Sequence, residues 1–151
     1  MSRVFVDANL LCLIVAGTVV PEAIGRHKRL RAFTAFDFDA VYAIVSDHSE
    51  VASCPHVLTE TSNLISQTHE TEAVKLKEGL RQLLCGMHEI QVASILAMER
   101  PEYLALGLTD AVILALQKKP ANLLTVDLGL TLAAQRAGFD VVNYNWLRDS
   151  Y

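Results

Sequence analysis

Four acidic residues stand where the sequence predicts the end of a strand or the start or middle of a helix: Asp7, Glu60, Asp110 and Asp127. They are scattered along the chain, so no local motif accounts for them together. In a parallel α/β sheet, such positions gather at one edge, where ligands bind. Carboxylates gathered there repel one another strongly unless a cation lies between them. The pattern therefore predicts an Mg²⁺ or Mn²⁺ site and, with it, phosphate chemistry.

Each acid also has an ordinary structural explanation. Asp7 and Asp127 can cap a helix by accepting a backbone N–H. Asp110 suits the first turn of a helix capped by Thr109, because the helix dipole favours negative charge there. Glu60 can lie on a solvated helix face. The four together, each in a similar setting, favour the metal site.

Two uncharged side chains are predicted to support these acids. Asn9 follows Asp7 by two residues and can hold a water or orient a carboxylate. Thr125 precedes Asp127 by two residues in a predicted strand, so it faces the same way and can supply a hydroxyl. Asn63 lies one helical turn after Glu60, on the same face.

The predicted elements alternate in a way that positions these residues. Short β-branched and aromatic runs predict strands at 3–7, 89–93, 122–126 and 140–144. Apolar periodicity predicts helices at 8–16 (ended by Gly17), 21–31, 56–67, 72–84, 95–100, 108–118 and 128–137. Residues 38–45 suit a helix or a strand, and 47–55 a loop. Strand–helix alternation implies parallel pairing with right-handed crossovers, so we expect an α/β fold.

The bulk composition limits the class of protein. The chain has 151 residues, is 52% hydrophobic and carries a net charge of -4. This length favours a single domain spanning 1–151, and the apolar surplus indicates a buried parallel sheet, a subunit interface, or both. The negative charge argues mildly against a nucleic-acid partner, although an acidic metal cluster itself contributes to it.

Two further features of the sequence indicate the cellular compartment of the protein. The apolar run 10–20 is too short to span a bilayer and is predicted to be a buried helix, so no membrane partner is expected. Cys12, Cys54 and Cys85 form no CxxC pair, and their odd number indicates a reducing compartment. We expect a cytoplasmic protein in which all three cysteines are buried.

The sequence resembles the PIN domain family of metal-dependent nucleases. The resemblance rests on Val-Asp-Ala-Asn-Leu-Leu at 6–11, Leu-Thr-Glu-Thr-Ser-Asn-Leu at 58–64, Leu-Thr-Asp-Ala-Val-Ile at 108–113 and Leu-Leu-Thr-Val-Asp-Leu at 123–128. Each motif alone is weak, but the four follow the family's order and cover most of the chain.

The resemblance implies a three-layer α/β/α fold with a central, mostly parallel sheet of four or five strands. It implies Mg²⁺- or Mn²⁺-dependent cleavage of RNA, with Asp7, Glu60, Asp110 and Asp127 as the acidic residues and Asn9 and Thr125 in support. Many short PIN proteins resemble VapC toxins, which implies an antitoxin partner and a homodimer. The distance from Asp7 to Glu60 is longer than in compact toxins, so an insert is expected around 35–55.

The basic run in the predicted helix 21–31 is the candidate for guiding the RNA backbone. Its members are Arg26, Lys28, Arg29 and Arg31. Phosphate contacts of this kind are electrostatic and weaken with salt. The alternative is an ordinary solvated helix face.

Other functions remain open. A haloacid-dehalogenase-type phosphatase also begins with a strand ending in Asp, but has a second Asp where this chain has Asn9. A receiver-like signalling domain requires paired acids before its first helix. A PIN-like fold that binds RNA or protein without cleavage is a third alternative. No histidine suggests a general base, since His27, His48, His56, His69 and His88 are all expected to be solvated.

Overall fold

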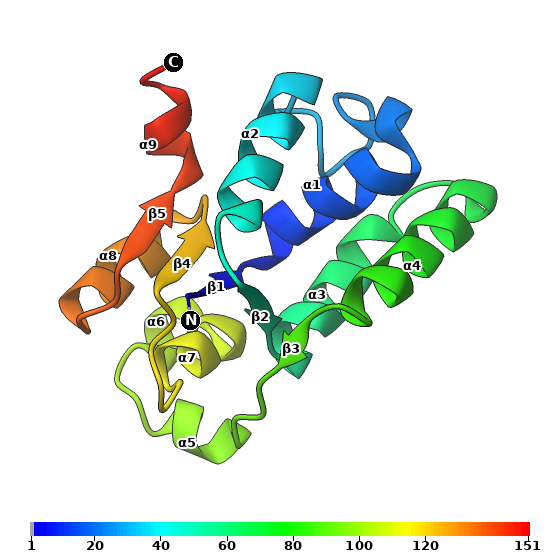
Figure 1. The fold of residues 1–151 in the computed structure, drawn as a ribbon. Coiled ribbons are helices and arrows are strands. Elements are labelled where there is room, and N and C mark those ends of the chain that lie inside the picture. Colours follow the sequence, from blue (N-terminus) through cyan, green and yellow to red (C-terminus); the bar gives the residue numbers. More distant parts are fainter. Residues whose placement is uncertain (1) are drawn as a thin grey trace.

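The computed structural model describes residues 2–151, and within this range the strands form one five-stranded, all-parallel sheet in the order β3-β2-β1-β4-β5 (Figure 1). The strands are β1 (Arg3–Val6), β2 (Glu50–Ser53), β3 (His88–Glu89), β4 (Asn122–Thr125) and β5 (Val141–Asn143). The predicted α/β class with a central parallel sheet is confirmed.

Helices cover the sheet in two groups. The first contains α1 (Ala8–Val19), the 3₁₀ helix η1 (Pro21–Ala23), α2 (Ala35–Ser46), α3 (Pro55–Ile65) and α4 (Glu70–Leu84). The second contains α5 (Ser94–Met98), α6 (Tyr103–Leu106), α7 (Leu108–Leu114) and α8 (Leu128–Arg136), and α9 (Tyr144–Arg148) follows β5. Figure 1 shows the two groups on opposite sides of the strands, and α3 of the first group also contacts α7 of the second. This arrangement is a three-layer α/β/α fold.

The core explains why the first strand and helix are so apolar. Val4, Phe5 and Val6 of β1 have no exposed surface, because β1 is the middle strand and both its faces are covered. Helix α1 is buried from Leu10 to Ala16, since it packs against α2, α3 and α4. Neighbouring strands β1 and β4 pair with Val6 opposite Leu124. This register places the residues that follow the two strands beside each other, and that edge of the sheet carries the candidate site.

The first helix is longer than predicted, and its glycine has a different role. Gly17 does not end α1, which continues to Val19. A Cβ atom at Gly17 would lie 2.0 Å from the ring of Phe38. The glycine is therefore required for the close approach of α2 to α1, a need that helix-end signals in the sequence do not distinguish.

The predicted helix 21–31 is wrong. Only the 3₁₀ turn Pro21–Ala23 forms, and the chain then passes through turns to Phe33. Gly25 adopts φ +85°, a left-handed conformation that interrupts a right-handed helix. The basic residues of this stretch consequently lie on a loop.

The predicted loop 47–55 is wrong in its central part, which forms a strand. Glu50–Ser53 forms β2, which pairs with β1 along Arg3, Val4 and Phe5. The span expected to be an insert, 35–55, thus contributes α2 and an inner strand. Strand β2 has only four residues, beginning with Glu50 and ending with Ser53. This segment is too short and too polar to show the alternation that predicts a strand. The short helices α6 and α9 were also not predicted.

Two findings concern the expectations about compartment. Cys12 and Cys54 are buried as predicted, whereas Cys85 is exposed at the end of α4. Across residues 2–151, no helix combines the length and apolarity needed to cross a membrane.

Candidate active site

The carboxylate of Asp7 is held by hydrogen bonds at the junction of β1 and α1. Its Oδ1 accepts from the backbone N–H of Ala8 at 2.8 Å, and its Oδ2 accepts from the hydroxyl of Thr125 at 2.8 Å. The Thr125 oxygen also accepts from the backbone N–H of Asp127 at 3.0 Å. Asp7 and Thr125 are buried, so this hydroxyl links the two predicted acids across neighbouring strands.

Asp127 combines a capping role with a position at the site. Its Oδ1 accepts from the backbone N–H of Leu130 at 2.9 Å, which caps α8 as predicted. The residue is exposed, and its charge raises the pKa of Asp7, Glu60 and Asp110. The second carboxylate oxygen forms no hydrogen bond within residues 2–151 and remains available.

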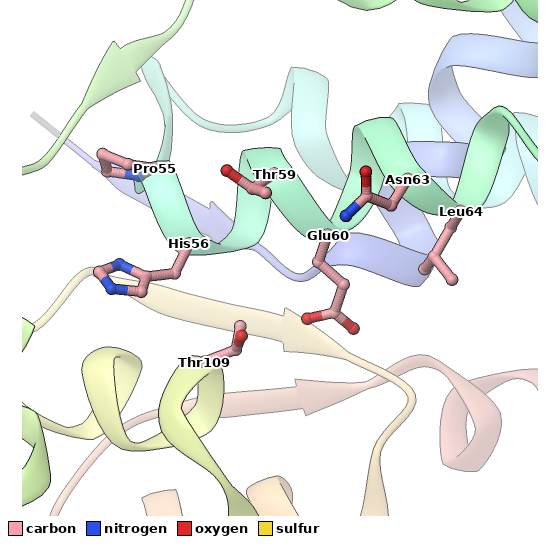
Figure 2. A pocket seen from close by; sticks show the side chains of 7 residues that line it. All are labelled: Pro55, His56, Thr59, Glu60, Asn63, Leu64 and Thr109. Atoms are coloured by element: carbon pink, nitrogen blue, oxygen red, sulfur yellow. The ribbon is translucent and has the colours of Figure 1, made fainter.

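Glu60 reaches this edge from the helix that follows β2. It is half-buried on α3, and Figure 2 shows its carboxylate directed towards Thr109 on α7. Burial raises the pKa of Glu60, as does the charge of Asp7, while a hydrogen bond from Thr109 lowers it. Glu60 is therefore partly withdrawn from solvent rather than on a fully solvated helix face.

Asp110 is an acid whose ionisation is strongly changed by its surroundings. It lies in the first turn of α7, which is capped by Gly107 rather than by Thr109 as expected. Burial, followed by the charges of Asp7, Asp127 and Glu60, raises the pKa of Asp110 to about 7. An isolated aspartate titrates near about 4, so all four predicted acids share one electrostatic environment.

The remaining supporting residue is Asn9. It lies in the first turn of α1, half-buried, and in the described chain its side chain forms no hydrogen bond. Asn9 thus follows Asp7 closely in the sequence, but no hydrogen bond joins the two side chains.

The donor set suits a hard divalent cation. Carboxylate and hydroxyl oxygens are the ligands that Mg²⁺ and Mn²⁺ prefer, and the acids here are Asp7, Glu60, Asp110 and Asp127. As the side chains lie, no three His, Cys, Asp or Glu residues in 2–151 converge closely enough to enclose an ion. Within residues 2–151 the Asp110 carboxylate forms no hydrogen bond, so no partner fixes the orientation of its side chain.

A cavity of about 450 Å³ opens beside the acids, between α3 and the start of α7 (Figure 2). It is lined by Pro55, His56, Thr59, Glu60, Asn63, Leu64 and Thr109. Glu60 belongs both to this wall and to the acidic cluster. The cavity joins residues from elements that are separated in the sequence, and only the Glu60–Asn63 face was predicted.

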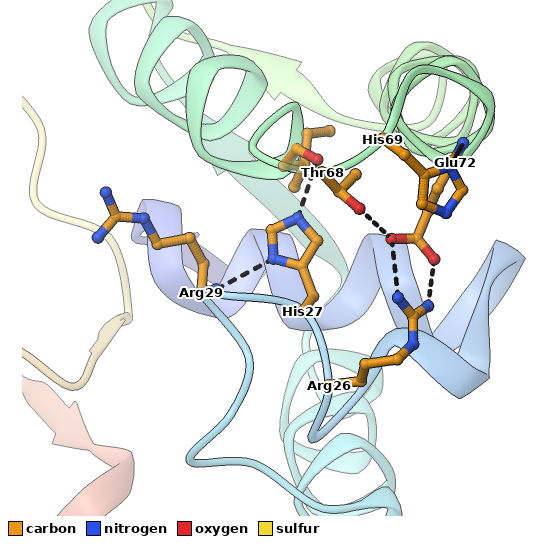
Figure 3. Close-up of polar contacts among 7 residues, drawn as sticks. Arg26, His27, Arg29, Thr68, His69 and Glu72 are labelled. Carbon is orange, nitrogen blue, oxygen red and sulfur yellow. Dashed lines mark hydrogen bonds and ion pairs between the residues drawn. The ribbon is translucent and has the colours of Figure 1, made fainter.

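Three histidines differ from the expectation that all are solvated. His48 is half-buried, and its Nδ1 lies 2.9 Å from the Ile44 carbonyl oxygen. His56 is half-buried, and its Nε2 lies 2.9 Å from the hydroxyl of Ser94. His27 is buried: its Nδ1 accepts from the backbone N–H of Arg29, so its Nε2 donates to the Ile65 carbonyl at 3.1 Å. His27 therefore joins the loop after η1 to the end of α3, a structural role (Figure 3).

The basic residues on that loop are not equivalent. All four predicted RNA-binding residues are exposed: Arg26, Lys28, Arg29 and Arg31. Arg26 forms an ion pair with the buried carboxylate of Glu72, which also accepts from Thr68 at 2.6 Å (Figure 3). Arg29 instead donates through Nε to Gln67 at 2.7 Å, and Figure 3 shows its guanidinium directed away from the Glu72 cluster.

The charge of Arg29 reaches Cys12, a buried residue of α1 that is also affected by the acids. The pKa of the Cys12 thiol is raised to about 12 by burial and by the charges of Glu60 and Asp7, and it is lowered by Arg29. One thiol thus lies within electrostatic reach of Arg29 and of two of the acids.

No protein-family model matches this chain, and no curated protein matches it significantly. The function is accordingly inferred from the arrangement of the side chains described above.

Proposed function

We propose that this protein is a ribonuclease that requires Mg²⁺ or Mn²⁺ and hydrolyses phosphodiester bonds of RNA. The observation that carries the proposal is the pKa of about 7 at Asp110, raised by burial and by three other acids. Carboxylates that repel one another at one edge of the sheet lower stability, whereas a bound cation favours their charged forms. The edge in question is the one where ligands bind in parallel α/β sheets.

The acids divide between holding the cation and facing the substrate. Asp7, Asp110 and Asp127 would hold the ion, and Glu60 would border it on the side of the cavity. When bound, a divalent cation lowers the pKa of a water molecule and offsets negative charge on phosphoryl oxygens. Glu60, with its raised pKa, is a better proton acceptor than an ordinary glutamate and can take the proton of the attacking water.

Neighbouring hydrogen-bond donors orient the Asp7 carboxylate before any cation binds. The Thr125 hydroxyl and the Ala8 N–H occupy one oxygen each of Asp7, so its carboxylate keeps one orientation. Hydrogen bonds of this kind to a ligating carboxylate tune metal affinity. No cysteine or serine nucleophile is required.

RNA is chosen over other phosphodiesters because of the resemblance to PIN domain nucleases. The position of Arg29 supports a polyanionic substrate. An antitoxin partner and a homodimer are part of the same proposal, supported by large exposed apolar residues on α5 and α6. These residues are Ile95, Leu96, Met98 and Leu104.

Cleavage of mixed RNA substrates tests the proposal directly. We expect cutting with Mn²⁺ or Mg²⁺, none with EDTA, and a loss of at least about 100-fold in Asp110→Asn. Asp140→Asn is the matched control, because Asp140 is an exposed aspartate just before β5. Wild-type protein that is folded, binds RNA and cuts none with any metal would instead indicate the non-cleaving binding module.

A further inference from the structure

We propose that the cavity between α3 and α7 binds the nucleoside next to the scissile phosphate, with Asn63 reading the base edge. This inference rests on the proposed ribonuclease function, because it places one flanking nucleoside of the same RNA. The cavity is continuous with the acidic site through Glu60, which lines both. Its volume of about 450 Å³ is in the range of pockets that hold small ligands.

The charge of the lining selects an uncharged occupant. None of the cavity-lining residues in the described chain is Lys or Arg, and Glu60 contributes a carboxylate. A phosphate in this cavity would face that carboxylate with no lysine or arginine to offset it. A nucleoside, by contrast, brings no charge, so the cavity suits the part of a nucleotide that lies beside the phosphate.

The lining also offers the two kinds of contact that bases use. Pro55, Leu64 and the ring of His56 line the cavity, and bases stack between aromatic and apolar side chains of this kind. His56 is held in place by its contact with Ser94. A preformed surface of this kind requires little ordering when a ligand binds.

Two hydrogen-bonding side chains on the cavity wall are available to a ligand. Asn63 and Thr59 are exposed, and neither side chain forms a hydrogen bond with any other residue in 2–151. The Asn63 amide offers both a donor and an acceptor, which is the pattern needed to pair with the edge of a base. In Figure 2 both side chains stand on the same helix as Glu60, one turn or less from it.

Nucleoside binding tests this site without depending on cleavage. The amide resonances of ¹⁵N-labelled protein are followed while adenosine, guanosine, cytidine or uridine is added, with no divalent metal. We expect shifts concentrated at Thr59, Asn63 and Thr109, strongest for one base, and about fivefold to tenfold weaker affinity in Asn63→Ala. Ser62→Ala, on α3 but outside this cavity, is expected to bind as the wild type. Inorganic phosphate is expected to leave these resonances unchanged.

Sequencing of RNA ends after cleavage provides the second readout. We expect a base preference adjacent to the cut that is weakened by Asn63→Ala and retained by Ser62→Ala. Metal-dependent cleavage with no nucleoside shifts, or with a base preference unaffected by Asn63→Ala, would overturn the subsite and leave the nuclease in place. Nucleoside shifts at these residues with no cleavage would support the subsite and overturn the nuclease.

Discussion

The hydroxyl of Thr125 donates a hydrogen bond to Oδ2 of Asp7 across 2.8 Å, although 118 positions separate the two residues in the sequence. The same oxygen accepts from the backbone N–H of Asp127. One buried hydroxyl therefore ties the ends of strands β1 and β4 together at the candidate site. Its removal should affect both stability and metal affinity.

Thr125→Val keeps the side-chain shape and deletes this hydroxyl. The buried Oδ2 of Asp7 loses its partner, so we expect a loss of about 1–3 kcal/mol in the free energy of unfolding. Mn²⁺ affinity is expected to fall about tenfold, as for other residues that orient metal ligands. Urea unfolding and titration calorimetry measure the two effects.

Thr61→Val is the matched control for that variant. Thr61 is equally buried, but its hydroxyl donates to the Val57 carbonyl within α3. We expect unchanged Mn²⁺ affinity in this variant. Equal losses of affinity in both variants would mean that Thr125 has no specific role at the site.

Asp110 predicts a pH dependence of stability in the absence of divalent metal. Its carboxyl has a pKa of about 7 in the folded protein and about 4 when unfolded. The folded state therefore binds the proton more tightly, and its contribution is complete below about pH 4. Stability is lost as the pH rises towards and through about 7.

Thermal unfolding in EDTA between pH 5 and pH 8 checks this expectation. Asp110→Asn should lessen the decline and raise the Tm at pH 8 by about 2–4 °C, because it removes a buried charge near three others. Asp140→Asn should follow the wild-type curve. If the Tm of the wild type and the Tm of Asp110→Asn changed by the same amount between pH 5 and pH 8, the raised pKa of Asp110 would be contradicted.

Replacement of Arg29 and of Arg26 by alanine is predicted to affect different properties, RNA binding in the first case and thermal stability in the second. Arg29→Ala should weaken RNA binding and reduce its salt dependence, since a phosphate contact is lost. Arg26→Ala should chiefly lower the Tm, because the buried Glu72 carboxylate loses its ion-pair partner. RNA binding by fluorescence anisotropy at several salt concentrations, beside thermal unfolding, separates the two. Equal loss of affinity in both would indicate a diffuse basic surface.

Gly17→Ala tests the contact between α1 and α2. Its Cβ would meet the ring of Phe38, so we expect a loss of about 1–3 kcal/mol in the free energy of unfolding. Gly86→Ala is the control, because its nearest contact is an ordinary 3.8 Å to the Leu83 carbonyl. Urea unfolding compares the two, and a neutral Gly17→Ala would show that α2 shifts freely against α1.

Several features of this protein follow from the sequence alone. The short apolar runs at β1 and β4 predict buried strands, and acids at their ends fall at the ligand-binding edge by topology. The capping role of Asp127 and the buried helix α1 also follow from local pattern. These features depend on near neighbours in the chain, which the sequence displays directly.

Other features depend on the tertiary structure. Strand β2 forms because β1 offers it hydrogen-bonding partners, and Gly17 is required only because Phe38 packs against it. The pairing of Arg26 with Glu72 and the cavity between α3 and α7 likewise join distant segments. Such contacts depend on how the helices pack onto the sheet, and the periodicity of each segment does not specify its partner. The sequence thus determined which residues could do chemistry, and the packing decided which of them meet.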